Sequence, residues 1–170
     1  MEKYYRQTIG LPVISHSRQP LTRVRDVIID TDKGKIVGFF VMGGSNHVVA
    51  PIDILEWNSV IMINDQEDII EPDEVHTIRE ALKKDATIFK KRVYTKSGDY
   101  LGKVLDFGMN SQLYELTVII VSKAFLSLFF WDKKIISSKD IIRIKPDRII
   151  VKDLVQTVPM EKFQVDMASP

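Results

Sequence analysis

Aspartates in a turn-like segment are the first residues of this sequence that could do chemistry. Asp30-x-Asp32-x-Gly34 resembles the start of a calcium-binding loop. An EF-hand loop needs an acidic ligand at its twelfth position, which is Val41 here, and strands rather than helices are predicted on both sides. The same pair would suit an aspartyl phosphotransferase, but no partner lysine or threonine motif follows in order. We therefore favour a pair of aspartates in a turn between strands.

Three histidines, at positions 16, 47 and 76, are the other candidates for metal binding. None is spaced from another as a ligand pair would be, and the sequence has no cysteine to complete a zinc site. His16 and His47 could approach each other in space, yet surface or structural roles fit them better. The glycine motifs that hold phosphates and the G-x-S-x-G motif of serine hydrolases do not occur. We expect no metal, no cofactor and no catalytic residue, and a protein that is not an enzyme.

Charge is distributed unevenly along the chain. Residues 1–85 carry 10 Lys and Arg against 14 Asp and Glu, a net charge of −4, whereas residues 86–170 carry 14 against 9, a net charge of +5. Residues 65–74 include six acids, which is typical of a solvated loop before a helix. A basic group could contact phosphates of ribosomal RNA or lie at a solvated helix end, and we favour the second interpretation. Its members are Lys83, Lys84, Lys90, Lys91 and Arg92.

The composition bounds the class of protein. Of 170 residues, 45% are hydrophobic and 28% charged, which is ordinary for a globular protein and argues against general disorder. The longest apolar stretch, residues 124–131, is far shorter than the roughly 20 residues that span a bilayer. The first ten residues lack the apolar run of a secretory signal. Together with the absence of cysteine, these features lead us to expect a cytoplasmic protein.

An internal repeat organises the chain. Residues 21–26 (LTRVRD) match residues 101–106 (LGKVLD) at a spacing of 80, as L-x-[RK]-V-x-D. Further on, residues 48–54 match residues 135–141 at a spacing of 87, so the second copy is seven residues longer. Each copy closes with a short β-branched run. The shared order of these weak matches indicates two copies of one unit.

Both copies have the pattern of short β-strands. In the first copy, an apolar run at residues 27–29 and another at 36–42 are separated by turn residues, and Gly43-Gly44-Ser45-Asn46 suits a hairpin. Five or six such strands in about 70 residues cannot bury both faces of an open sheet. Closure into a small barrel, which also removes the sheet edges, is therefore the expected solution.

One helix is predicted between the copies. Pro72 suits a first helical position, and acidic residues follow it where a helix dipole favours them. Val75, Ile78 and Leu82 form an apolar stripe at helical spacing, which we expect to pack against a barrel.

With these motifs in view, the sequence resembles the PRC-barrel family. The LGKVLD strand and the segment at residues 48–54 correspond to the family's most typical strands, and the resemblance covers most of residues 9–64 and 88–153. The first copy departs from the pattern at Thr22, where the family usually has glycine, and the second departs at Ser137-Ser138 and in its longer loop.

The resemblance implies a fold and a division into domains. The fold would be mainly β, with two small PRC-type (SH3-like) β-barrels in tandem joined by a short α-helix. The expected boundaries are residues 1–70 for the first barrel, 71–86 for the linker helix, 87–157 for the second barrel and 158–170 for a C-terminal tail. The tail could add a strand to a sheet edge or fray.

The resemblance also implies a protein-docking module without catalytic residues. Members of the family support a photosynthetic reaction centre, and a related barrel in the ribosome maturation factor RimM docks on a protein of the small ribosomal subunit. We therefore expect an adaptor whose protein partner is unidentified, with homo-oligomers as one form that binding could take. A RimM-like factor acting on the small subunit and a peripheral membrane adaptor are the alternatives. Nucleic acid is expected as a partner only through a ribosomal assembly.

The longer loop of the second copy is the candidate partner-binding segment. It occupies a hairpin tip, where polar residues are expected, but it is rich in aromatic and aliphatic residues. It would form an exposed interface, or its rings would fold back over the barrel or the linker helix, and both interpretations remain open. The candidate residues are Phe125, Leu126, Leu128, Phe129, Phe130 and Trp131. The acidic loop at residues 65–74 and the helix that follows it are the second candidate docking surface.

Overall fold

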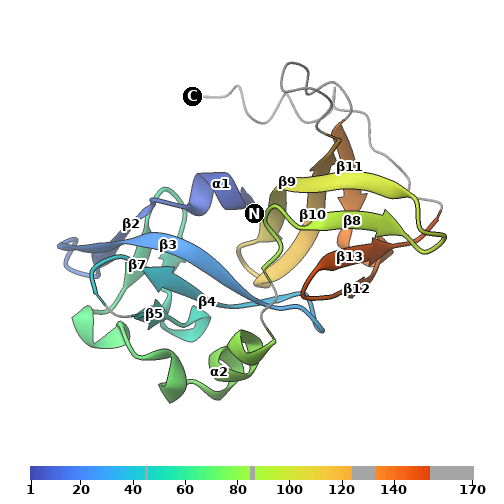
Figure 1. Cartoon of the computed structure of the whole chain (residues 1–170). Coiled ribbons are helices and arrows are strands. Elements are labelled where there is room, and N and C mark those ends of the chain that lie inside the picture. The colour runs from blue at the N-terminus through green and yellow to red at the C-terminus, as the bar shows by residue number, and fades with distance from the viewer. Residues whose placement is uncertain (45, 85–86, 124–132, 154–170) are drawn as a thin grey trace. The chain divides into compact units, whose positions relative to one another are not determined.

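The chain is mainly β, as predicted, and divides into two compact units (Figure 1). The computed structural model describes all residues except 45, 85–86, 124–132 and 154–170. Unit 1 consists of Met1–Thr87 and Gly108–Leu116, and unit 2 of Ile88–Phe107 and Thr117–Pro170. Each unit thus corresponds to one sequence repeat, except that the tip of a second-repeat hairpin belongs to unit 1.

Unit 1 is built around two long strands that follow a short N-terminal helix. This helix, α1, spans Tyr5–Thr8. The strands are β1 (Glu2–Tyr4), β2 (Pro12–Ser15), β3 (Pro20–Asp30), β4 (Lys35–Val41), β5 (Val48–Val49), β6 (Glu56–Trp57) and β7 (Ile61–Ile63). Short 3₁₀ turns follow at η1 (Pro51–Asp53), η2 (Gln66–Asp68) and η3 (Pro72–Glu74), and the helix α2 spans His76–Lys83.

Unit 2 repeats the order of elements from β2 to β7. Its strands are β8 (Arg92–Thr95), β9 (Tyr100–Asn110), β10 (Glu115–Ser122), β11 (Lys133–Ser137), β12 (Ile141–Ile144) and β13 (Arg148–Val151), with the 3₁₀ turn η4 at Ser138–Asp140. The first residues of β10 and the last residues of β9 belong to unit 1.

Strand pairing is the same in both units. In unit 1, β2 pairs with β3 antiparallel and with β7 parallel, and β7 also pairs with β6. In unit 2, β8 pairs with β9 antiparallel and with β13 parallel, and β13 also pairs with β12. The central long strands pair with β5 and β11 respectively. The curled sheets fit small barrels, and their common topology confirms the internal repeat.

The shared L-x-[RK]-V-x-D motif lies on β3 and β9, where it serves the fold. Its valines, Val24 and Val104, are fully buried. Each of its aspartates binds the backbone amide of the next residue. Asp26 accepts a hydrogen bond from the Val27 amide at 2.8 Å, and Asp106 accepts one from the Phe107 amide at 2.9 Å. In β3 the register with β4 shifts at this point, so the carboxylate satisfies an amide at a bulge.

Aromatic rings fill the centre of unit 1. Phe39 is fully buried and meets Trp57 edge to face, with ring centroids 4.8 Å apart. Tyr114, from the hairpin tip at residues 108–116, stacks on Trp57, with ring centroids 5.7 Å apart. A residue of the second repeat therefore completes the core of the first barrel, and burial raises the pKa of the Tyr114 phenol.

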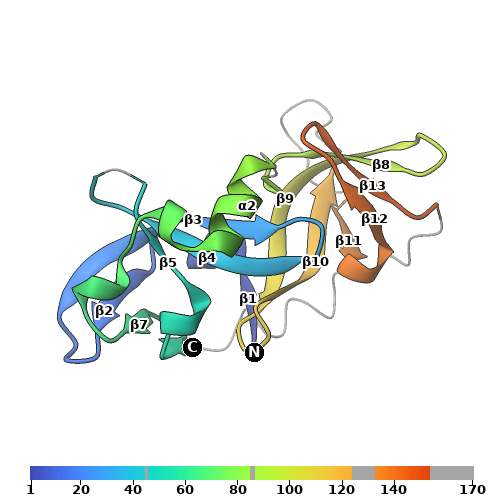
Figure 2. The same ribbon diagram turned by 90° about the horizontal axis from the view of Figure 1, so that it is seen from below.

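The helix α2 packs on unit 1, as the sequence predicted. It lies over β3 and β4 (Figure 2) and buries Ile78 and Ala81 in a cluster with Ile28 and Val48. Gly38 on β4 makes room for it, because a Cβ atom there would lie 2.8 Å from Ile78 Cδ1. The predicted stripe was wrong at its last position, since Ala81 is buried whereas Leu82 is 38% exposed.

The helix also begins later than predicted. Pro72 opens the 3₁₀ turn η3, and α2 starts only at His76. The Glu71 amide donates to the Glu74 carboxylate at 2.9 Å, which fixes this turn rather than the first turn of the helix.

Candidate docking face

The predicted aromatic segment, residues 125–131, lies outside the described residues, as does the tail at 158–170. The candidate surfaces below lie in the described part of the chain.

The aspartate pair of the first repeat makes a local ion-pair network. Lys84 Nζ lies 2.6 Å from Asp32 Oδ2 and 3.4 Å from Asp30 Oδ1, and the Asp32 amide donates to Asp30 at 3.1 Å. These contacts join the β3–β4 turn to the end of α2. The aspartates thus form the turn pair that the sequence predicted.

Two of the three histidines have side-chain partners of their own. His47 Nε2 is 3.2 Å from a Glu71 carboxylate oxygen, and His76 Nδ1 is 3.1 Å from an Arg79 nitrogen. Within the described residues no three His, Cys, Asp or Glu side chains gather as metal ligands.

Most of the predicted basic group is used in local contacts. Lys83 pairs with Glu80 at 2.8 Å, and Lys84 binds the aspartate turn. Lys91 is buried and donates to the Lys145 carbonyl at 2.9 Å. These three lysines fit the interpretation of a helix end and its connection, rather than a free phosphate-binding patch.

A more informative feature is a long stretch of unit 1 without positive charge. Residues 36–78 contain no Lys or Arg. Their eight acidic residues are Asp53, Glu56, Asp65, Glu67, Asp68, Glu71, Asp73 and Glu74. Glu71 lies 3.2 Å from His47 Nε2, and within the described residues the other seven have no Lys or Arg within ion-pair distance.

Two large apolar side chains are exposed within this stretch. The turn η1 carries Ile52 outward, where it is 90% exposed, and Leu55 just beyond it is 52% exposed. The flanking residues point inward, because Ala50 and Trp57 are both buried. Ile52 and Leu55 are therefore not part of the barrel core. Their burial against a partner would be favourable, because it would remove apolar surface from water.

Acidic groups surround these two side chains. Asp53 follows Ile52 directly, and Glu56 follows Leu55 on β6, the edge strand. Asp68 is close enough to Asp53 to raise its pKa, although partial burial of the Asp53 carboxyl is the larger cause. We call this surface the acidic face, defined by Ile52, Asp53, Leu55, Glu56 and residues 65–68.

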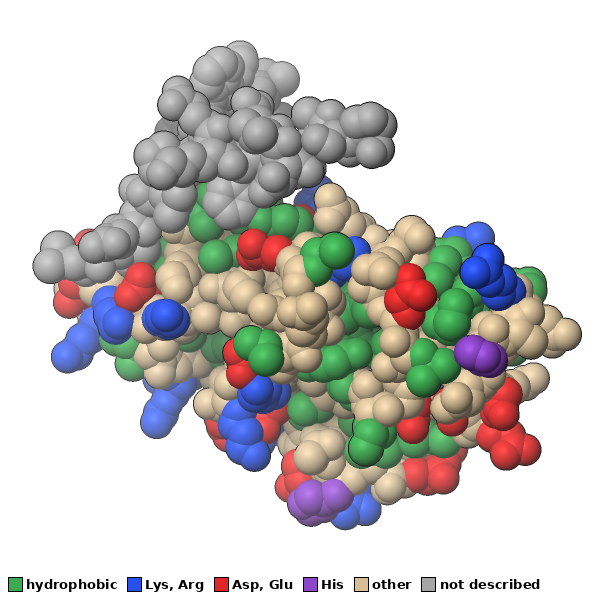
Figure 3. All heavy atoms as spheres, turned by 180° about the vertical axis from the view of Figure 1, so that it is seen from behind, with side chains coloured by type: hydrophobic (Ala, Val, Ile, Leu, Met, Phe, Trp, Pro, Cys, Tyr) green, Lys and Arg blue, Asp and Glu red, His purple; other side chains and the backbone are tan. Residues whose placement is uncertain are grey.

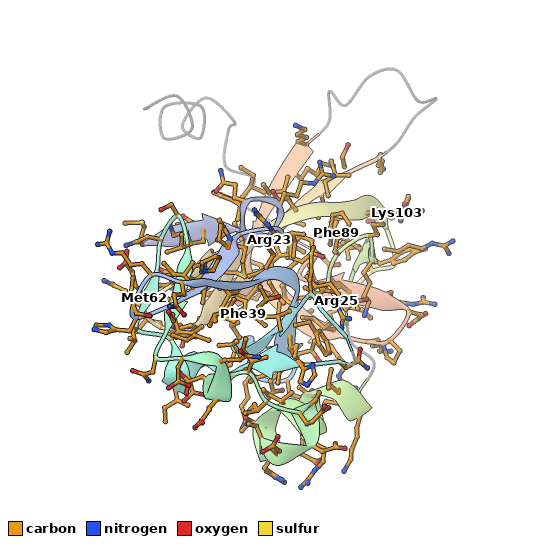
Figure 4. The ribbon with its side chains drawn as sticks, turned by 90° about the vertical axis from the view of Figure 1, so that its left-hand side faces the viewer. Arg23, Arg25, Phe39, Met62, Phe89 and Lys103 are labelled. Carbon is orange, nitrogen blue, oxygen red and sulfur yellow. The ribbon has the colours of Figure 1, made fainter. Side chains whose placement is uncertain are left out.

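Acidic and apolar side chains lie side by side on unit 1. Figure 3 shows acidic and hydrophobic side chains interspersed on the surface of unit 1. In Figure 4, Phe39 lies in the interior of unit 1, whereas Met62 lies at its periphery. The Leu55 amide donates to the Met62 carbonyl at 2.8 Å, so Met62 is next to the acidic face.

Unit 2 carries a surface of opposite charge at the equivalent place. Residues 133–152 include seven Lys and Arg and two Asp. At the repeat spacing of 87, Lys139 corresponds to Ile52, Ile142 to Leu55 and Arg143 to Glu56. Ile142 is 50% exposed, much as Leu55 is. We call Lys139, Ile142, Arg143 and Lys145 the basic edge.

The two surfaces share one kind of composition. Each combines exposed aliphatic side chains with charges of one sign, which is the composition of a protein–protein contact with electrostatic steering. The sequence interpretation did not single out Ile52 and Leu55. The signal that could have revealed them is the absence of Lys and Arg from residues 36–78.

Comparison with known families identifies the fold. Two small curled β-sheets of equal topology in tandem define a duplicated β-barrel protein. The PRC-barrel domain model matches the chain twice, at residues 1–75 and 82–156, so the chain belongs to the PRC-barrel family. The resemblance stated from sequence is thereby confirmed, as is the fold of two tandem barrels. No curated protein matches the chain. Within the described residues, none of the helices is long and apolar enough to cross a membrane.

Proposed function

We propose that this protein is a non-enzymatic adaptor that docks on another protein through the acidic face of unit 1. The observation that carries the proposal is the exposure of Ile52 and Leu55 among carboxylates that, within the described residues, have no Lys or Arg in ion-pair contact. An isoleucine that is 90% exposed contributes nothing to its own barrel, and its equivalent in the second repeat is Lys139, so the fold does not require an apolar residue there.

The chemistry of the face indicates the kind of partner. Apolar residues at the centre supply affinity when water is excluded, and carboxylates around them select a surface that carries Lys or Arg. A partner with an aliphatic or aromatic anchor surrounded by basic residues fits this face. The absence of cysteine from all 170 residues further supports action in the reducing cytoplasm.

The proposal is tested by site-specific crosslinking in native cells. A photo-crosslinking amino acid at position 52 should trap a partner protein, and the Ile52→Ser, Leu55→Ser double variant should lose that partner by affinity capture. Met42→Ser is the matched control, because Met42 is an exposed apolar residue of unit 1 outside the acidic face. Thermal melting should be almost unchanged in both variants. Retention of the partner by the double variant would show that the acidic face is not the docking surface.

The aromatic segment of the second repeat is tested in parallel. If it is an interface, Phe129→Ser should abolish partner capture while leaving the melting temperature almost unchanged, whereas a large drop would assign Phe129 to the core. A captured small-subunit ribosomal protein would favour a RimM-like factor. Co-sedimentation with anionic or neutral vesicles would favour a membrane adaptor instead.

A further inference from the structure

Two strands hold the same position at the edges of the two units. In unit 1 the strand path ends with β6, which pairs with β7, and in unit 2 it ends with β12, which pairs with β13. Neither strand has a second strand partner among the described residues. An edge strand of this kind is a natural place for another chain to bind.

The two edges share an apolar residue. Leu55 beside β6 and Ile142 on β12 are 87 residues apart in the repeat, and they are 52% and 50% exposed. On the acidic face Ile52 extends the apolar surface next to Leu55. None of these side chains is buried in its own barrel core. Burial of them against another chain would therefore be favourable at both edges.

The charges of the two edges are opposite at equivalent positions. Glu56 on the acidic face corresponds to Arg143 on the basic edge, and both side chains are exposed. Within the described residues Lys139 and Arg143 have no carboxylate within ion-pair distance. The nearby Asp140 is already paired with Lys152 at 3.0 Å, so it does not neutralise them.

We propose that the protein associates head to tail with a second copy of itself, the basic edge of one copy binding the acidic face of the next. Ile142 would contact Ile52 and Leu55, while Lys139 and Arg143 would approach the carboxylates. This inference rests on the proposed docking function of the acidic face and names a second copy as one partner of matching chemistry. Because the two surfaces differ, the contact is heterologous, and it continues from copy to copy unless a ring closes.

The test uses the full-length chain in sedimentation velocity and light scattering over a range of concentrations. The wild-type protein should form species larger than a monomer as concentration rises. Raising the salt from about 50 mM to about 500 mM should weaken this association by on the order of tenfold, since exposed charges are screened. A wild-type protein that stays monomeric at all concentrations and at low salt overturns the inference.

Two variants, each broken on one surface, make the test specific. The first variant, Ile52→Lys with Glu56→Lys, disrupts the acidic face and keeps the basic edge. The second variant, Ile142→Glu with Arg143→Glu, disrupts the basic edge and keeps the acidic face. Each variant alone should remain monomeric. Their equimolar mixture should form a 1:1 dimer and nothing larger, because it contains one intact pair of surfaces. A mixture that stays monomeric, or either variant assembling alone, contradicts head-to-tail binding.

A charge control separates a specific contact from a change in net charge. Asp73→Lys reverses an exposed acid of unit 1 outside the acidic face and should assemble as the wild type does. Failure of self-association is distinguishable from failure of the docking function. A monomeric wild type whose Ile52→Ser, Leu55→Ser variant loses its crosslinked partner would refute self-association and leave the docking function standing.

Discussion

Lys35 lies opposite Glu115 where β4 pairs with β10, and its Nζ contacts the Glu115 carboxylate. The two residues are 80 positions apart, which is the spacing of the repeat, so one position of the repeat meets its own equivalent. Both side chains are more than 40% exposed, and such a surface ion pair contributes only about 0–1 kcal/mol.

Backbone hydrogen bonds on both sides of this pair also join equivalent positions of the two repeats. The Ile36 amide donates to the Tyr114 carbonyl at 2.7 Å, and the Leu116 amide donates to the Gly34 carbonyl at 2.8 Å. Residues 34 and 36 thus bind residues 116 and 114, their equivalents in reverse order. This self-complementary contact explains why Gly108–Leu116 belongs to unit 1.

The repeat also explains the unusual backbone of Arg18, one of three non-glycine residues with positive φ among the residues that the structure describes. Arg18 has φ of 64°, and its equivalent in the second repeat is Gly98, with φ of 101°. Lys90 and Tyr114 likewise correspond to Gly10 and Gly34, and both glycines have positive φ. Each strained residue therefore occupies a place where the other repeat keeps glycine.

The first prediction follows from this correspondence. Arg18→Gly should stabilise unit 1 by up to about 1 kcal/mol, because relief of roughly 1–2 kcal/mol of left-handed strain exceeds the entropy cost of glycine. Chemical denaturation followed by tryptophan fluorescence measures this. The exposed neighbour Gln19 has no positive φ, so Gln19→Gly should instead lower stability by about 0.5–1 kcal/mol. Equal destabilisation by both changes would refute the explanation.

Sequence pattern predicted the repeat, the β class and the buried strands because those properties depend on local periodicity. The buried Val24 and Val104 are examples, since alternation within one strand places them inward. Tyr114 could not be placed in this way. Its packing on Trp57 depends on a hairpin of one repeat joining the core of the other, and no local pattern encodes such a long-range contact.

The exposure of Ile52 escaped sequence analysis for a similar reason. It stands in an apolar segment with Val48, Val49 and Ala50, all of which are buried, so a hydrophobic pattern alone assigns it to the core. The 3₁₀ turn that begins at Pro51 reverses its direction. A single turn of this kind moves a side chain from the interior to the surface without changing the composition around it.

The second prediction concerns Gly102, where the second repeat has glycine and the first has Thr22. A Cβ atom at position 102 would lie 2.2 Å from the Ser122 carbonyl oxygen, and φ there is +128°. At the equivalent place in unit 1, the Thr22 hydroxyl donates to the Met42 carbonyl at 2.6 Å. Gly102→Ala should therefore cost about 3 kcal/mol or more, or prevent unit 2 from folding.

The matched variant in unit 1 should be mild. Thr22→Ala removes one hydrogen bond on an open strand and should cost about 1 kcal/mol. Thermal denaturation followed by circular dichroism compares the two. If Gly102→Ala proved as mild as Thr22→Ala, the close approach of β9 and β10 would be disproved.

The third prediction concerns the packing of α2 on β4. Gly38→Ala should cost about 1–3 kcal/mol, because its Cβ would press against Ile78 Cδ1. Ile78→Val removes that methyl group and should cost about 0.5–1.5 kcal/mol alone. In the double variant the new methyl occupies the vacated space, so the total cost should be at least 0.5 kcal/mol below the sum of the two. Additive free energies of unfolding would show that Gly38 and Ile78 do not meet.

The last prediction uses the pH dependence of stability to probe the acidic face. Partial burial, with the nearby charge of Asp68, raises the pKa of Asp53 above its ordinary value of 3.8. The folded protein therefore binds more protons than the unfolded chain between 3.8 and the higher pKa, and ionised Asp53 destabilises it as the pH rises through that interval. Asp53→Asn, which keeps the size without the charge, should raise the denaturation midpoint at pH 7.

The advantage of Asp53→Asn should shrink as the pH falls and disappear below about pH 3, where the carboxyl of the natural residue is neutral in both states. Urea denaturation at a series of pH values measures the difference. A pH-independent difference would mean that Asn acts through packing and that Asp53 is not under electrostatic strain. A partner that carries Lys or Arg would relieve the same strain on binding, so its affinity for the wild type should exceed its affinity for the Asn variant.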